Sequence, residues 1–488
     1  MKLLLPDKNL SRKLYEQVAD SIQTLIKEGT LQPGDRLPSV RKLHQQLGVS
    51  ISTVLEAYRS LEDGGLIVVR PQSGYYVKQT YHRPPHEPNP SDPCLEVLPI
   101  DNSIAFQVHS DIRDRQTLKL GAAVPAPELF PTAVLNRLMA KVIRSEPELV
   151  HAYNVPPGCA ALRHEVAKRL IDAGCSLTPE QIVVTNGASE AVYLALKAVT
   201  KPGDTVAIES PCYYGILEVL EVLHLKALEL PTHPREGISL DHLEVALSKK
   251  QIAACILVSN FSNPLGYTMS DDNKQRLVEL LNYYKIPLVE DDVHGEVYFG
   301  KVRPKAIKAF DSQNRVLYCG SVSKTLSSGL RVGWCVPGCY QARVKQLKLV
   351  INMTTPVAPQ LTVAAFLANG GYERHLRQLR RTYQLQMSHM TQAICQYFPA
   401  ETRVTRPQGG HVLWLELPPE FEVMELYQEA LQAKISIAPG VIFSPSGSYS
   451  NCLRLNCGLP WSERIDQAMA TLGMLVKKQL ARKILANN

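Results

Sequence analysis

The chain has 488 residues, of which 45 % are hydrophobic and 20 % charged, and its formal net charge is +7. This length exceeds one ordinary core and predicts two or three domains. No apolar run of about 18 residues could span a bilayer, and Asp7 and Lys8 cut the leucine-rich start short of a secretory segment. We therefore expect a cytoplasmic protein that makes no membrane contact. The modest positive charge permits a polyanionic partner without requiring one.

The eleven cysteines are scattered along the chain. There is no Cys-x-x-Cys pair and no cluster that combines cysteines with histidines. Structural metal sites usually show such spacings, so we expect reduced thiols and no metal.

Residues 10–78 carry the pattern of three short helices. Apolar residues recur every three or four positions from Tyr15 to Ile26, and Gly29 is placed to end this first helix. Ser39 can cap a second helix that stops at Gly48. Ser50 can cap a third helix, with glycines 64 and 65 at its end.

A hairpin follows the third helix. Residues 66–70 and 75–77 are β-prone and flank the turn Pro71-Gln72-Ser73-Gly74. Helix, tight turn, helix and hairpin together predict a winged helix-turn-helix, whose third helix enters the major groove of duplex DNA. The alternative is a small helical interaction module, because three short helices are a common arrangement. Charge alone does not identify a DNA-binding part, since residues 1–80 carry only 11 Lys and Arg against 8 Asp and Glu. The candidate DNA contacts are cations, short hydroxyls and the wing glycine: Arg36, Ser39, Arg41, Ser50, Ser52, Thr53, Arg59 and Gly74.

This segment resembles a known family over about 65 residues. The resemblance lies in Pro33-Gly34-Asp35-Arg36-Leu37-Pro38-Ser39-Val40-Arg41-Lys42-Leu43, in Leu47-Gly48-Val49-Ser50, and in the later pairs Thr53-Val54 and Ala57-Tyr58. These motifs are similar to the GntR-type winged helix. The resemblance implies that the segment binds double-stranded operator DNA.

Residues 79–117 are rich in proline. Prolines at 84, 85, 88, 90, 93 and 99 exclude a continuous helix and predict a stiff, extended spacer between two domains that can change position. A short helix fits within 100–116.

Residues 118–488 alternate apolar strand-like runs with amphipathic helices. Such runs occupy residues 181–185, 205–208, 254–258, 286–290 and 316–319. This alternation predicts an α/β fold with a mostly parallel sheet, in which ligands gather at the carboxyl ends of the strands.

Polar motifs follow three of these predicted strands. Thr185-Asn186-Gly187-Ala188-Ser189 opens a helix, where backbone N–H groups can hold a phosphate. Glu290-Asp291-Asp292 places carboxylates that need a cationic partner, although a helix cap or a metal pair would also use them. Lys324 stands among small and apolar residues, which lowers the pKa of an amine and favours Schiff-base chemistry.

The order of these motifs resembles the fold-type I pyridoxal-phosphate proteins of the aspartate aminotransferase superfamily, over about residues 118–480. The resemblance implies that Lys324 binds pyridoxal 5′-phosphate covalently, that Asp291 pairs with its ring nitrogen, and that Asn263 bonds its ring hydroxyl. It implies that Tyr213 stacks on the ring and that Arg454 binds a substrate carboxylate. Tyr153 would reach the phosphate of a neighbouring subunit in a homodimer. The phosphate would be held by Gly187, Ala188, Ser189, Ser321 and Arg331.

One position departs from that family's pattern. Relatives carry a tyrosine two or three residues after the ring-nitrogen aspartate, where this chain has Val293 and His294. His294 could replace the tyrosine as a donor to the ring hydroxyl, and we then expect it to titrate near neutrality. Weak or vestigial transamination follows from this departure.

A GntR-type winged helix fused to an aminotransferase-like domain is similar to the MocR subfamily of transcription regulators. The resemblance implies a DNA-binding regulator that senses an amino compound or a B6 vitamer through its cofactor. Two alternatives stay open: an active aminotransferase with an accessory DNA-binding domain, and a scaffold with a dead pocket.

Overall fold

The computed structural model describes residues 12–27, 30–31, 34–70, 73–77, 85–93, 95–100, 103–111, 114 and 116–486. They form two compact units. The first holds the described residues before position 78 together with 385–398, and the second holds the described residues of 85–384 and 399–486.

The first unit contains the predicted helices and hairpin. Ser39 and Ser50 cap their helices by accepting from the backbone N–H groups of Lys42 and Thr53. Gly48 has φ 63°, a left-handed conformation that ends the second helix. The predicted stop at Gly29 and the turn residues 71–72 lie outside the described residues. The elements are α1 (Leu14–Lys27), α2 (Val40–Leu47), α3 (Ile51–Asp63) and the antiparallel strands β1 (Ile67–Arg70) and β2 (Gly74–Val77).

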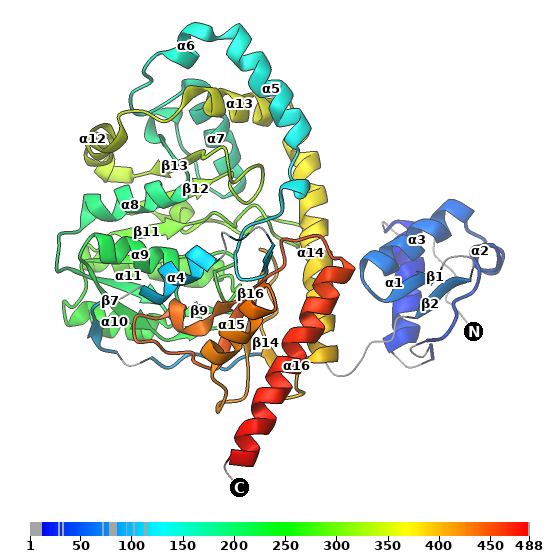
Figure 1. Cartoon of the computed structure of the whole chain (residues 1–488). Coiled ribbons are helices and arrows are strands. Elements are labelled where there is room, and N and C mark those ends of the chain that lie inside the picture. The colour runs from blue at the N-terminus through cyan, green and yellow to red at the C-terminus, as the bar shows by residue number, and fades with distance from the viewer. Residues whose placement is uncertain are drawn as a thin grey trace. The chain divides into compact units, whose positions relative to one another are not determined.

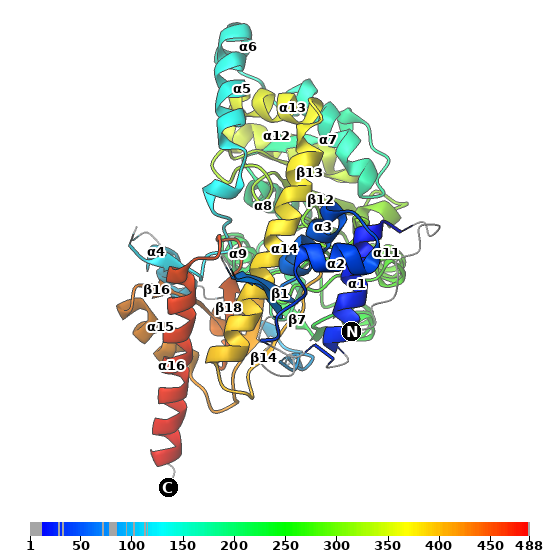
Figure 2. The same cartoon turned by 90° about the vertical axis from the view of Figure 1, so that its right-hand side faces the viewer.

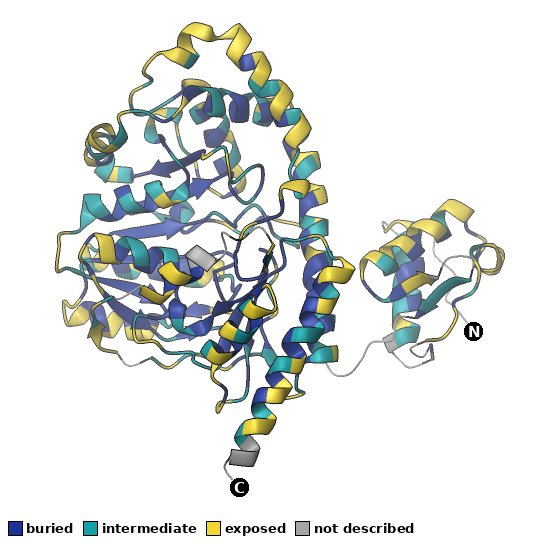
Figure 3. Cartoon of the chain, viewed as in Figure 1, coloured by how far each residue is buried: buried dark blue, intermediate teal, exposed yellow. Residues whose placement is uncertain are grey.

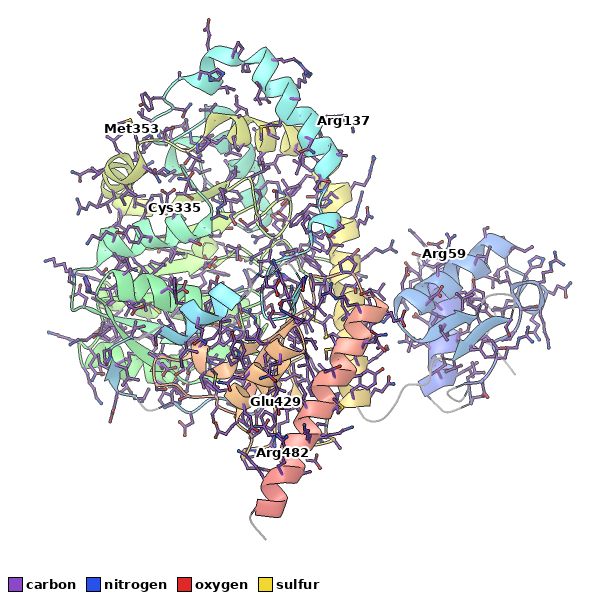
Figure 4. The ribbon with its side chains drawn as sticks, viewed as in Figure 1. Arg59, Arg137, Cys335, Met353, Glu429 and Arg482 are labelled. Atoms are coloured by element: carbon purple, nitrogen blue, oxygen red, sulfur yellow. The ribbon has the colours of Figure 1, made fainter. Side chains whose placement is uncertain are left out.

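A small apolar core fixes α3 against the rest of this unit. Leu43, Val54 and Tyr58 are fully buried in it, and the Tyr58 hydroxyl donates to the carbonyl of Pro38 at 2.6 Å. The opposite face of α3 is open to solvent, and the Arg59 side chain on it is 73 % exposed (Figure 4). This is the arrangement that a winged helix needs, with one helix face free for a partner.

An eight-stranded mixed sheet forms the centre of the second unit (Figure 1). Five adjacent strands, from β7 to β12, are parallel, while β3 and β13 run antiparallel to their neighbours. The prediction of a mostly parallel sheet is confirmed. In spatial order the strands are β3 (Val97–Leu98), β7 (Lys226–Leu230), β6 (Thr205–Glu209), β10 (Ala254–Leu257), β11 (Leu288–Asp291), β12 (Val316–Ser321), β13 (Gly333–Val336) and β5 (Val183–Thr185).

Both faces of this sheet are covered. On β12, Leu317 and Cys319 pack into one apolar cluster, whereas Tyr318 between them packs into another. Alternate side chains of a strand point to opposite faces, so the two clusters lie on opposite sides of the sheet. Figure 3 shows these strands buried and the outer faces of the surrounding helices exposed.

Helices and smaller sheets complete the second unit. A four-stranded antiparallel sheet has the order β14 (Arg403–Val404), β15 (Val412–Glu416), β18 (Cys452–Asn456) and β17 (Ala438–Pro439), and the short pairs are β16 (Ile435–Ser436) with β4 (Leu118–Lys119) and β8 (Thr232–His233) with β9 (Gly237–Ile238). The end of α16 extends past the other elements of this unit (Figure 2).

None of the helices among the described residues has the length and apolar character needed to cross a membrane. The helices are α4 (Ser103–Asp111), α5 (Thr132–Ser145), α6 (Pro147–His151), α7 (Ala160–Asp172), α8 (Ala188–Val199), α9 (Tyr214–Val222), α10 (Leu240–Ser248), α11 (Asp271–Tyr284), α12 (Gln341–Asn352), α13 (Val357–Ala368), α14 (Gly371–Tyr397), α15 (Val423–Gln432) and α16 (Glu463–Ala486).

The proline-rich segment is bonded to the second unit from Pro85 onward. Glu87 forms an ion pair with Arg235, and Ser91 bonds the backbone of Thr232 and of Ser210. Residues 97–98 then pair with β7 as an edge strand. We call residues 85–98 the strap. The described residues of the strap are held along the second unit because their polar groups find partners there, and a helix follows at Ser103–Asp111.

Candidate active site

A cavity of about 230 Å³ lies at the carboxyl ends of β11 and β12 and at the first turns of α8 and α9. Side chains from segments far apart in the sequence meet in it. The cavity brings together nine of the predicted residues: Ala188, Ser189, Tyr213, Asn263, Asp291, His294, Ser321, Lys324 and Arg331.

Lys324 follows the end of β12. Its Nζ donates to the carbonyl oxygen of Ala123 at 2.6 Å. Burial lowers the pKa of this amine to about 8, and the charge of Arg454 adds to the effect, while Asp291 opposes it. The amine therefore becomes neutral, as a nucleophile must be, at a mildly basic pH rather than only above pH 10.

Asp291 is the acidic residue that faces the cavity at the end of β11. Glu290 instead accepts from the backbone N–H groups of Ile307 and Lys308, and Asp292 forms a buried ion pair with Arg303 at 2.6 Å. Burial raises the pKa of Asp291 to about 7. A cation placed beside this carboxylate would reverse that shift.

The turn at Gly187 forms a cradle with Arg331. Gly187 has φ 81°, and a Cβ atom there would lie 2.3 Å from Arg331 Nη2. That nitrogen donates to the carbonyl of Asn186 at 2.9 Å, which holds the guanidinium beside the first turn of α8. A cation and open backbone N–H groups at one helix start suit an anion.

Tyr213 stands immediately before α9 and lines the cavity. A Cβ atom at Gly215 would lie 2.6 Å from the Tyr213 ring, so a glycine is required where the ring rests on the helix. Burial raises the pKa of Tyr213 further above its usual value, and the phenol stays neutral. Its buried ring provides an apolar wall on which a planar ligand can stack.

Arg454 lies behind the cavity rather than on its surface. It is fully buried on β18; Nη1 donates to Asn263 Oδ1 at 2.9 Å, and Nη2 donates to the carbonyl of Gly121. Because the Asn263 oxygen accepts from Arg454, the amide nitrogen of Asn263 is left to donate elsewhere. A substrate carboxylate would have to displace one of these guanidinium bonds.

His294 is 2 % exposed and lines the cavity. Burial lowers the pKa of His294 to about 3, and the nearby charges of Lys324 and Arg454 act in the same direction. Our expectation that His294 titrates near neutrality is therefore wrong for this environment. Its imidazole is neutral at physiological pH and can still donate through one ring nitrogen.

His411 is a neighbour that the sequence pattern did not reveal. It is fully buried, and its ring centroid lies 5.3 Å from that of His294 and 5.2 Å from that of Tyr383. Tyr383 in turn donates to the backbone oxygen of Lys324 at 3.0 Å. No motif marks position 411, because its importance arises only from this packing.

Several buried polar atoms around the cavity have no hydrogen-bond partner among the described residues. They include Arg454 Nε and one ring nitrogen each of His294 and His411, whose imidazoles otherwise approach the backbone of Phe261 and of Ala123. Buried polar groups are rarely left unpaired in a folded chain, so this cluster indicates a polar ligand. The neutral amine of Lys324, the acceptor at Asp291 and the cradle at Gly187 fit a phosphorylated aldehyde with a basic ring nitrogen.

One predicted residue lies apart from the cavity, and two residues that line the cavity were not predicted. Tyr153 is 78 % exposed after α6 and does not line the cavity. Ser323 and Ser328 do line it, and the Ser328 hydroxyl donates to the Ser323 backbone oxygen at 2.9 Å. Both serines lie in the motif around Lys324, so their place in the lining could have been predicted from that motif.

The candidate DNA contacts lie on α2, α3 and the wing of the first unit. Ser50 Oγ lies 2.7 Å from Ser52 Oγ and 2.8 Å from Thr53 Oγ1, so these hydroxyls form one cluster at the start of α3. Arg36 bridges to β2 beside Gly74, while Arg41 is exposed on α2 near the capping Ser39. Arg59 lies 3.8 Å from Glu56 at the exposed surface.

Comparison with known families agrees with both units. Residues 14–77 match the gntR family of bacterial regulatory proteins, and residues 123–472 match aminotransferase class I and II. The chain thus combines a DNA-binding regulatory domain with an aminotransferase fold. It belongs to both families, in the arrangement of the MocR subfamily.

Two relatives match almost the whole chain. The uncharacterized HTH-type transcriptional regulator YdcR of Escherichia coli (strain K12) is 40 % identical over 475 residues, 96 % of this chain and 100 % of the relative. YjiR of the same strain, an uncharacterized regulator of the same type, is 39 % identical over 96 % of this chain and 99 % of its own length.

A solved structure matches the second unit. The α-aminoadipate aminotransferase LysN from Thermus thermophilus, complexed with N-(5′-phosphopyridoxyl)-L-leucine, has a TM-score of 0.71 and 30 % identity. The match covers 78 % of this chain and 100 % of the LysN chain. The family and this complex together imply that the chain binds pyridoxal phosphate.

Proposed function

We propose that this protein is a transcription regulator that binds operator DNA through its winged helix and senses an amino compound or a B6 vitamer through a pyridoxal-phosphate site. The observation that carries the proposal is the presence, in one chain, of a gntR domain and a cavity that gathers Lys324, Asp291 and Asn263. The full-length regulator relatives support this function over that of an enzyme.

Each part of the cofactor would find a partner in the cavity. Lys324 would bind the aldehyde, Asp291 would pair with the ring nitrogen, and the amide of Asn263 would donate to the ring hydroxyl. Gly187, Ala188, Ser189, Ser321 and Arg331 would hold the phosphate, and Tyr213 would stack on the ring. When bound, the cofactor supplies an aldehyde that reacts with amines and a ring that withdraws electrons.

The chain's own residues would do the remaining work. Asp291 keeps a proton on the ring nitrogen, and the buried wall formed by Tyr213 excludes water from one side. His294 donates a neutral hydrogen bond in place of the family's tyrosine. Arg454 exchanges its bond to the Gly121 carbonyl for an incoming carboxylate, which would release the backbone at residues 121–124.

We infer that the strap transmits a ligand-induced change at the cavity to the DNA-binding domain. Ser210 stands three residues before Tyr213, and its carbonyl accepts from Ser91 of the strap at 2.6 Å. Its hydroxyl also meets Glu229 and Tyr449, each at 2.6 Å. A ligand that moved Tyr213 would strain this buried network and so pull on the strap.

We further propose that the protein acts as a homodimer in which Tyr153 reaches the phosphate of the neighbouring subunit. Tyr153, Val155, Val350 and Met353 are all at least 45 % exposed, and the Thr354 hydroxyl donates to the carbonyl of Asn154 at 2.6 Å. Met353 lies at the surface of the second unit (Figure 4). An apolar surface of this kind favours a protein partner. Sedimentation velocity would measure the state of assembly.

The second candidate is an active aminotransferase with an accessory DNA-binding domain. Lys324 and Arg454, which such an enzyme needs, are both present. A dedicated enzyme turns over on the order of 10 times per second. Since His294 replaces the usual tyrosine, we expect much slower transamination here.

The experiment that tests the proposal uses the full-length, cofactor-loaded protein. Genomic fragments that it retains are sequenced with and without a panel of amino acids, amines and B6 vitamers, and the visible spectrum is followed alongside. A regulator retains a defined promoter and changes its affinity when one compound changes the spectrum. Turnover on the order of 10 per second without any DNA retention would instead establish the enzyme.

A further inference from the structure

A second concave surface lies along the first half of α14, apart from the cavity at Lys324. It is a groove of about 730 Å³ between residues 298–301 and residues 373–384. Its lining contains five cationic side chains and one carboxylate, that of Glu373. The cations are Lys301, Arg374, Arg377, Arg380 and Arg381.

The core holds this part of α14 in place. Leu376, Leu379 and Tyr383 are at most 2 % exposed and face the inside of the second unit. Arg374, Arg377 and Arg381 alternate with them and line the groove. The three arginines are therefore presented on a fixed helix.

Most of this positive charge is not neutralised. Glu373 is engaged by Arg169, and Arg380 lies 3.6 Å from Glu296 and over the Tyr298 ring. Among the described residues, Arg374, Arg377 and Arg381 form no ion pair. A run of charges is usually a solvated helix face, but such faces tend to mix both signs, and this one is concave.

The length over which the three arginines are spread is comparable to that of a few regularly spaced phosphates on a nucleic-acid strand. Positions 374, 377 and 381 share one helix face and span about 10 Å at a rise of 1.5 Å per residue. One DNA strand carries a phosphate about every 3.4 Å along the axis, so about four consecutive phosphates span the same length. Arginine forks also bind phosphate oxygens bidentately.

We propose that this groove binds the sugar-phosphate backbone of duplex DNA outside the sequence read by the winged helix. The inference rests on the DNA-binding part of the proposed function. Once the winged helix holds a duplex, further phosphates of that duplex are present at high effective concentration. The groove would then add affinity and salt dependence without adding sequence specificity.

The test uses three variants of the full-length, cofactor-loaded protein. The first changes Arg374, Arg377 and Arg381 to Gln, and the second changes the same residues to Lys. The control changes Lys201, Lys226 and Lys249, which are exposed elsewhere on the second unit, to Gln. Fluorescence anisotropy follows binding to a mixed-sequence duplex of about 60 bp between roughly 50 and 200 mM KCl, a range in which the log-log salt slope is linear.

The glutamine variant should lower the log-log salt slope by roughly 0.9 per arginine, and thus by ~2.7 in all. The lysine variant should keep most of the slope, because the contact depends on charge. The control should behave as the unchanged protein. Equal slopes for the unchanged protein and the glutamine variant, or an equal loss in the lysine variant or the control, would overturn the inference. Failure of the unchanged protein to bind any duplex would instead overturn the proposed function.

Discussion

The Ser91 hydroxyl donates to the backbone oxygen of Ser210 at 2.6 Å, although 119 residues separate them in the chain. The same hydroxyl accepts from the backbone N–H of Thr232 at 2.8 Å. Ser91 belongs to the strap and Ser210 to the segment that carries Tyr213. One side chain therefore joins the segment that leads from the DNA-binding domain to the wall of the cofactor cavity.

Ser91→Ala should weaken communication between effector and DNA. Loss of this partly buried hydrogen bond costs about 1 kcal/mol, and if all of it belongs to the coupling, the effector-dependent change in DNA affinity falls by about fivefold. Anisotropy titrations with and without effector measure that change. The cofactor spectrum should be unaltered, and Ser248→Ala, at an exposed helix end, serves as control. If the effector changed the DNA affinity of Ser91→Ala as much as that of the unchanged protein, the strap would not transmit the effect of the ligand.

Lys324→Ala should abolish the covalent adduct that borohydride traps with pyridoxal phosphate. No other amine lies among the described residues that line the cavity. Intact-mass and peptide mass spectrometry locate the adduct, and Lys197→Ala is the control. An adduct on a different lysine of the Lys324→Ala protein would show that the site is wrongly assigned.

His294→Phe should act in opposite directions on the two forms of the protein. In the cofactor-free form it removes a buried imidazole that has a ring nitrogen without a partner among the described residues, so the thermal midpoint should rise. In the loaded form it removes a neutral donor, and affinity for pyridoxal phosphate should fall about five- to tenfold. Calorimetry and absorbance titration measure the two effects. A lower midpoint in the cofactor-free form would contradict this account of the orphaned imidazole.

The contribution of Asp291 to the stability of the cofactor-free protein should fall as pH rises from about 4 to 7, whereas the lowered pKa values of His294 and His411 act in the opposite direction. Asp291 has a folded pKa of about 7, above its unfolded value, so the folded state binds more protons in this window and stability falls as they leave. Asp291→Asn should make the decline shallower, by as much as ~4 kcal/mol in unfolding free energy at neutral pH. Denaturant titrations at several pH values test this. An identical decline in both proteins would assign it to Glu209 and Glu290, whose pKa values are also raised by burial.

Arg41→Ala should reduce the salt slope of DNA binding by ~1, the value of one phosphate contact. The residue is exposed on α2, so the fold should be unaffected. Lys201→Ala provides the matched loss of one charge. A slope equal to that of the unchanged protein would place Arg41 outside the DNA interface.

Much of the architecture could be predicted because it depends on local patterns. Ser39 and Ser50 cap their helices as expected, and β6 and β12 begin where the apolar runs begin. Polar motifs at strand ends met in one cavity, since parallel strands bring their carboxyl ends to the same edge. Asp291 was chosen over its two acidic neighbours through the family resemblance, and the structure places the partners of the other two elsewhere.

What escaped prediction depends on contacts between distant segments. The bonds of the strap join Ser91 to Ser210 and Thr232, and no motif marks any of the three. The pKa of His294 depends on how completely β-strands and loops bury it, which a reference value for an exposed imidazole cannot express. His411 likewise gains its place beside His294 only after the chain has folded.

The cradle at Gly187 offers a way to hold the protein in a single state. A methyl group at this position would meet the guanidinium of Arg331 and would also strain a backbone at φ 81°. The methyl group would occupy the space in which an anion binds, while every charged and hydrogen-bonding group of the site stayed in the chain. Gly187→Ala thus separates the contribution of the bound vitamin to gene control from the contribution of the polypeptide alone.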